Sequence, residues 1–97
     1  MEAEKENGQV RLTIHVAGRV QGVFFRESAR RKAIELGLTG YARNELDGSV
    51  TLEVEGNVQQ AKHFLDWCRK GPPLARVQQV IYRVAPSRQE FIGFVVQ

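Results

Sequence analysis

Glycine and arginine residues that suit anion binding occur together in residues 18–26, where the sequence is Gly-Arg-Val-Gln-Gly-Val-Phe-Phe-Arg. Gly18 and Gly22 allow tight turns and let a ligand approach the backbone closely. A helical pattern begins at Phe25, and no Ser, Thr, Asp or Asn stands directly before it, at the N-cap, to satisfy the first free N–H groups. Such N–H groups bind anions, and Arg26 in the first turn can clamp two oxygens of a phosphate or carboxylate. A tight structural turn with hydrated N–H groups explains the same pattern, so spacing alone leaves both interpretations open.

The elements around this segment follow from hydrophobic periodicity. Strict alternation predicts a strand with one buried face over residues 10–16, and weaker or similar patterns predict strands over 39–44 and 50–56. Two helical stripes follow the 3.6-residue period. Their members are Phe25, Ala29, Ala33 and Leu36 in the first helix, and Val58, Ala61, Phe64, Leu65 and Cys68 in the second. Gly37 suits a left-handed helix end with Leu38 closing over it, and Gly71-Pro72-Pro73 ends the second helix.

Two more strands are expected over residues 77–85 and 91–96, although unbroken apolar runs leave the facing of their side chains open. The order is therefore βαββαβ plus a C-terminal strand. This order predicts an α+β fold of the ferredoxin-like, split βαβ type, with two helices on one face of an antiparallel sheet.

Topology brings a second residue to the glycine segment. A right-handed crossover makes the first two strands parallel, so Asn44, at the end of the second strand, should emerge beside residues 18–26. A neutral amide can hold a water next to a bound phosphate, but Asn44 is equally typical of the turn before Asp47-Gly48. Arg69, Lys70 and Arg76 should lie near the same edge, either to attract an anionic substrate or as solvated charge.

Composition excludes several classes of protein. The 97 residues and 11.0 kDa fit one domain, with residues 1–8 as a mobile polar tail and 9–97 as the folded domain. No apolar run approaches the roughly 18 residues that span a bilayer, and the opening segment does not resemble a signal peptide. A single cysteine, Cys68, excludes an internal disulfide and a multi-cysteine zinc site, and it favours the cytoplasm. His15 and His63 are too far apart in sequence to form a local metal site.

Other possible sites have simpler explanations. Cys68 continues an apolar stripe, which indicates a packing thiol. Glu45 and Asp47 fit a solvated turn as well as they fit a carboxylate pair. The net charge of +3 and pI near 9.4 suit small anions or nucleic acid, but no paired aromatic motifs support RNA binding. There is no Walker-type nucleotide loop.

Two segments together resemble the signature patterns of the acylphosphatase family. The first is residues 18–26, and the second is Gly-Tyr-Ala-Arg-Asn at 40–44 followed by Asp-Gly-Ser-Val at 47–50. The similarity extends over residues 10–96, and two long motifs in the right order are a specific signal. The resemblance implies a ferredoxin-like enzyme that hydrolyses the carboxyl–phosphate bond of small-molecule acyl phosphates. Its products would be a carboxylate and inorganic phosphate.

The resemblance also implies roles for single residues. The family's substrate-binding arginine corresponds to Arg26 and its water-orienting asparagine to Asn44. The backbone cradle for the phosphate corresponds to Arg19, Val20, Gln21, Gly22 and Val23. No metal, nucleotide or covalent enzyme intermediate is expected, and inorganic phosphate or another anion should be able to occupy the site. We expect a cytoplasmic monomer that contacts neither nucleic acid nor membrane.

The chain departs from the commonest family pattern at Phe24, Tyr41 and Ala42, none of which carries the implied chemistry. Two other functions stay open at this point. One is a non-catalytic anion-binding module, as in the acylphosphatase-like domain of hydrogenase-maturation carbamoyltransferases. The other is nucleic-acid binding through the basic surface. The chain reaches Gln97 with no zinc motif, which favours the stand-alone enzyme.

Overall fold

The computed structural model describes residues 8–97. The predicted polar tail, apart from Gly8, lies outside the described residues. Gly8 itself accepts a hydrogen bond from the backbone N–H of Val58 at 3.1 Å, so it contacts the folded part of the chain. No helix among residues 8–97 is long and apolar enough to cross a membrane.

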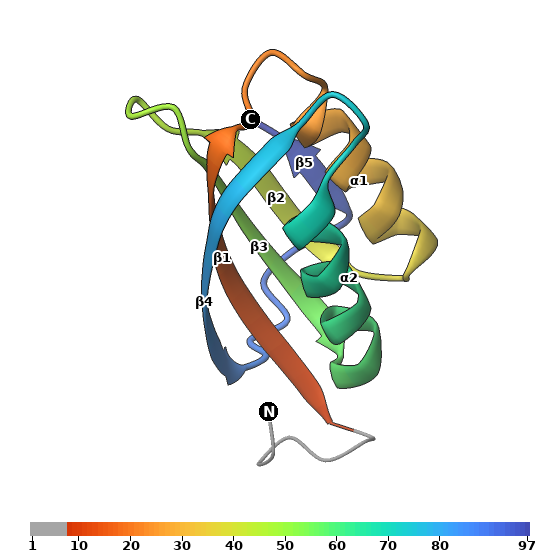
Figure 1. The fold of residues 1–97 in the computed structure, drawn as a ribbon. Helices are drawn as coiled ribbons and strands as arrows, with labels where there is room; N and C mark the ends of the chain where they lie inside the picture. Colours follow the sequence, from red (N-terminus) through yellow and green to blue (C-terminus); the bar gives the residue numbers. More distant parts are fainter. Residues whose placement is uncertain (1–7) are drawn as a thin grey trace.

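Seven elements follow the predicted order (Figure 1). They are β1 Gln9–Arg19, α1 Phe25–Glu35, β2 Thr39–Asn44, β3 Val50–Asn57, α2 Val58–Lys70, β4 Arg76–Pro86 and β5 Phe94–Val96. One sheet has the strand order β4-β1-β3-β2-β5, and both helices cover the same face of it. The first four strands pair antiparallel, whereas β5 pairs parallel with β2. The ferredoxin-like fold is therefore confirmed, and the added strand makes the sheet mixed.

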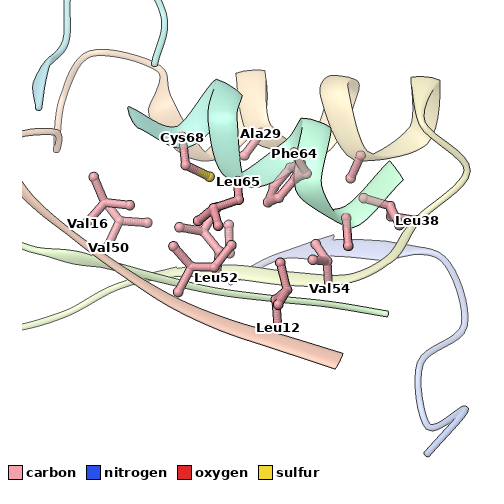
Figure 2. Packing of buried hydrophobic residues seen from close by; sticks show 14 of the residues in the cluster. Leu12, Val16, Ala29, Leu38, Val50, Leu52, Val54, Phe64, Leu65 and Cys68 are labelled. Carbon is pink, nitrogen blue, oxygen red and sulfur yellow. The ribbon is translucent and has the colours of Figure 1, made fainter. Parts of the chain in front are cut away.

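The buried core lies between the sheet and the two helices. Leu12, Val16, Val50, Leu52 and Val54 point from the central strands towards Phe64 and Leu65 of α2 (Figure 2). All five members of the stripe predicted for α2 are buried, including Cys68. The facing of β4, open from sequence, is settled by its partly buried valines, Val77, Val80 and Val84, which pack on the core.

The end of α1 confirms the predicted glycine cap. Gly37 has a φ of 73°, its N–H donates to the Ile34 carbonyl at 3.0 Å, and the Leu38 N–H donates to the Ala33 carbonyl at 2.8 Å. This pair of bonds is a Schellman motif, and the buried Leu38 side chain closes over it. The motif turns the chain from α1 into β2 and thereby sets the position of Asn44 at the end of β2.

The helix-free face of the sheet is partly covered by residues 87–93, which cross from β4 to β5 (Figure 1). The Glu55 carboxylate accepts hydrogen bonds from the backbone N–H groups of Arg88 at 2.7 Å and Glu90 at 3.1 Å. Glu55 is consequently only 3% exposed, although strand alternation alone would place it in solvent. This crossing delivers β5 to the edge beside β2.

A β-bulge lies at Ala17/Gly18, where the glycine segment begins, and β1 approaches β4 closely at Gly18. Gly18 has a φ of 131°, and a Cβ atom there would lie 2.2 Å from the Arg76 carbonyl oxygen and 2.8 Å from the Gln78 nitrogen. Both neighbours are backbone atoms, so they cannot move aside as a flexible side chain could.

We expect Gly18→Ala to destabilise the fold by about 4 kcal/mol or more, because it combines a backbone clash with a disfavoured φ. Urea denaturation followed by circular dichroism would measure the loss. Gly93→Ala is the matched control, since Gly93 has a φ of 72° but no atom within 4 Å of its Cβ position. Equal losses in the two variants would show that the close approach at Gly18 is unimportant.

Candidate active site

The loop between β1 and α1 contains two residues in the left-handed region, a feature that anion-binding loops share. Gly22 and Phe24 have positive φ values of 74° and 64°, with Val23 between them outside the left-handed region. Alternation of right- and left-handed residues turns successive N–H groups towards one point. Within residues 8–97, no hydrogen bond joins the N–H groups of residues 20–24 to another protein group. These donors, at the positive end of α1, are therefore available to an anion.

Arg26 lies in the first turn of α1, and its Nη1 donates a hydrogen bond to the backbone oxygen of Gln97. Gln97 is held in turn by its own N–H, which donates to the Ala42 carbonyl of β2 at 2.9 Å. The end of the chain thus fixes the guanidinium beside the loop. The sequence alone did not indicate this contact.

Asn44 is the last residue of β2, where it pairs with Val50. Its Oδ1 atom is buried and has no hydrogen-bond partner among the described residues. A buried acceptor without a partner costs free energy, typically about 1–3 kcal/mol. Such an atom in a native fold is explained when it serves a ligand or a water.

One hollow of about 280 Å³ brings these groups together. Its lining includes Val20, Gly22, Phe24, Arg26 and Asn44, with Val96 of β5 as a wall. The expected juxtaposition of Asn44 with the glycine loop is therefore present. The contribution of β5 was missed, because the sequence contains no signal for a parallel pairing of the last strand with β2.

Gln21 connects the loop to the hairpin that carries Asn44. Its side-chain Nε2 donates to the Glu45 carbonyl at 2.8 Å and to the Ser49 carbonyl at 2.9 Å. The resemblance assigned Gln21 only a backbone role, so this side-chain function was not anticipated. The two bonds fix the distance between the loop and the end of β2.

We expect Gln21→Leu to lower kcat/KM by about tenfold or more, because a small misplacement of positioning groups is costly in rate. The same change should destabilise the fold by about 1–3 kcal/mol, since two carbonyls lose their donor. Steady-state kinetics and thermal melting would measure both effects. Gln59→Leu, on the exposed face of α2, is the control and should change neither. Full activity in Gln21→Leu would rule out the positioning role.

A second hollow of about 410 Å³ adjoins the first, and Gly22 lines both. Arg19, Val23, Leu74 and Arg76 also line this second hollow. Arg19 belongs to β1 and pairs with Arg76 of β4. Unlike Val20 and Gly22, it does not line the first hollow. Of the three basic residues expected at this edge, Arg76 lines a hollow beside the loop, whereas Arg69 and Lys70 are exposed on α2 and line neither.

The carboxylates near the site are engaged in local contacts. Glu27 lines the first hollow, and its pKa is lowered chiefly by the hydrogen bond from Arg30, with help from Arg31. The pKa of Asp47 is lowered by hydrogen bonds from Ser49. The Ser49 N–H donates to Asp47 Oδ1 at 2.9 Å, and the Ser49 hydroxyl donates to the same oxygen at 2.6 Å. Asp47 is therefore a turn-stabilising residue, as one of the two interpretations proposed. Burial raises the pKa of the Cys68 thiol, as expected for a packing residue.

Comparison with known proteins identifies the family of the chain. The acylphosphatase family model matches residues 12–96. An acylphosphatase from Methylococcus capsulatus is 52% identical over 86 residues, which cover 89% of this chain and 94% of that relative. An acylphosphatase structure from Coxiella burnetii superposes with a TM-score of 0.87 at 36% identity over 100% of both chains. HypF from T. kodakarensis gives a TM-score of 0.76 at 33% identity, covering 89% of this chain but 11% of that one. The chain belongs to the acylphosphatase family, whose known activity is the hydrolysis of acyl phosphates.

Proposed function

We propose that this chain hydrolyses acyl phosphates in the hollow shared by residues 20–24, Arg26 and Asn44. The observation that carries the proposal is the Asn44 Oδ1 atom, which is buried and has no hydrogen-bond partner within residues 8–97. It shares a hollow with a guanidinium and with a loop whose N–H groups are likewise unpaired within those residues. A protein that needed these residues only for folding would gain stability by pairing that oxygen. The arrangement instead suits a phosphate with a water beside it.

In this proposal the phosphoryl group lies in the concavity of the loop, where the N–H groups of residues 20–24 donate to its oxygens. Arg26 neutralises its charge and can make two parallel hydrogen bonds to it. The Gln97 contact holds the guanidinium on the correct side of α1 before substrate arrives. These groups stabilise charge on the equatorial oxygens, which is the main requirement of phosphoryl transfer.

Asn44 supplies the second element of the proposal. Its Oδ1 accepts a hydrogen bond from a water and holds that water in line with the acyl leaving group. The water attacks phosphorus, the bond from phosphorus to the carboxylate oxygen breaks, and a carboxylate leaves with inorganic phosphate as the other product. A carboxylate leaves readily without a protein acid, and the phosphate of the substrate can accept the proton of the water.

The proposal includes a monomeric, metal-independent enzyme in the cytoplasm. The single buried cysteine is compatible with a reducing compartment.

The decisive experiment follows hydrolysis of benzoyl phosphate by absorbance with EDTA present. We expect rapid turnover that EDTA does not reduce. Turnover that requires an added metal ion would contradict the metal-independent mechanism. If the folded protein binds inorganic phosphate but hydrolyses no acyl phosphate, the chain is an anion-binding module instead.

A further inference from the structure

Phe24 has a backbone conformation that is unusual for a bulky residue. Its φ of 64° and ψ of 26° lie in the left-handed region, where glycine and asparagine are far more common. It also precedes the first residue of α1 as the N-cap but provides no side-chain hydrogen bond to the helix. Phenylalanine therefore suits neither the dihedral angles nor the capping role of this position.

The Phe24 side chain contributes little to the folded core. It is 74% exposed, whereas the adjacent Phe25 is 1% exposed and packs against Trp67 with ring centroids 5.3 Å apart. Phe24 does not belong to the core cluster of the described residues. A strained backbone together with an exposed ring is unfavourable for stability, and such combinations gather at functional sites.

Phe24 also belongs to the wall of the proposed site. Phe24 lines the same hollow as Arg26 and Asn44, and its side chain is exposed there rather than packed in the core. The acyl group of an acyl phosphate begins one oxygen away from phosphorus and must pass along the wall of this hollow. An aromatic side chain there offers an apolar surface on which a flat acyl group can stack.

We propose that Phe24 determines acyl-group specificity by contacting an apolar, and especially an aromatic, acyl group. This inference rests on the proposed function and adds a substrate preference to it. Small acyl groups such as acetyl would gain little from the ring, whereas aryl acyl groups would gain binding in both ground and transition states.

The test compares kcat/KM for benzoyl phosphate with kcat/KM for acetyl phosphate. The ratio of the two cancels any general effect of a variant on the phosphate-binding loop. We expect Phe24→Gly to lower the benzoyl-to-acetyl ratio by about threefold to tenfold, the range expected for loss of one aromatic contact. Phe24→Tyr should keep the ratio of the wild type. Ile92→Ala removes an even more exposed apolar side chain in the segment before β5 and serves as the control.

Two outcomes would overturn the inference. The ratio could stay unchanged in Phe24→Gly, or fall to the same extent in Ile92→Ala. If Phe24→Gly leaves the ratio unchanged and Leu74→Ala lowers it, the acyl group lies in the neighbouring hollow. If the folded wild type hydrolysed neither substrate, the proposed function would fail first. Thermal melting provides the second measurement, because Phe24→Gly relieves the strained dihedral angles and should not lower the melting temperature by more than Ile92→Ala does.

Discussion

Replacing Arg26 by alanine is expected to lower kcat/KM for acetyl phosphate by about 10³-fold or more, the effect of removing an arginine that stabilises a transferring phosphoryl group. Both KM and kcat should suffer, because the guanidinium contacts the phosphate in the ground state and in the transition state. Inorganic phosphate should bind more weakly to the same variant. Steady-state kinetics and phosphate inhibition would measure the two effects.

Two further variants test whether Arg26 acts through its charge alone or through the geometry of its guanidinium. Arg26→Lys keeps the positive charge but loses the planar pair of donors, so it should recover only part of the activity. Arg69→Ala removes an exposed arginine that does not line the hollow, and it should leave activity close to wild type. Similar losses in Arg26→Ala and Arg69→Ala would mean that only the overall basic charge matters. Melting curves would check that loss of the Gln97 contact has not unfolded the chain.

Replacing Asn44 by alanine is expected to lower kcat by about 10²–10³-fold, the usual result of removing one positioned polar group from an active site. Phosphate should still bind, because Arg26 and the N–H groups of the loop are untouched. This variant should therefore differ from Arg26→Ala in its effect on KM and on phosphate inhibition. Hydrolysis at the wild-type rate would disprove the water-positioning role.

The stability of Asn44→Ala provides an independent check. Since Oδ1 is buried and has no hydrogen-bond partner within the described part of the chain, its removal should leave the melting temperature unchanged or raise it. Asn44→Asp has nearly the same shape but introduces a negative charge beside the phosphate. It should lower both activity and phosphate affinity. A large loss of stability in Asn44→Ala would instead indicate that Asn44 serves the fold.

Most of the fold could be predicted because its signals are local. A strand alternates with a period of two and a helix with a period near 3.6, so the core faces of β1 and α2 could be assigned from spacing. Gly37 marked the end of α1 because few residues other than glycine adopt its left-handed conformation without strain.

The remaining parts of the fold depend on contacts between distant segments. Glu55 alternates like a solvent-facing residue, and it is buried only because residues 87–93 cross over it. The parallel pairing of β5 with β2 has no local signal either, since a three-residue edge strand can pair in several ways. Burial and pairing of this kind depend on register and chain path, which periodicity does not encode.

The candidate active site likewise combines features that have local sequence signals with features that depend on distant contacts. Sequence by itself indicated residues 18–26 and Arg26 as a candidate anion site, because glycine spacing, the absence of a capping side chain and the helix start all lie within this segment. Chain order alone was enough to bring Asn44 to the same edge, since crossovers between parallel strands have one hand. Only the tertiary structure decided that Asn44 Oδ1 is buried with no partner among residues 8–97, that Gln21 fastens the loop to the hairpin, and that Gln97 holds Arg26. The burial of Asn44 and the contacts of Gln21 and Gln97 involve residues far apart in the chain, and they arise only when strand register and packing are complete.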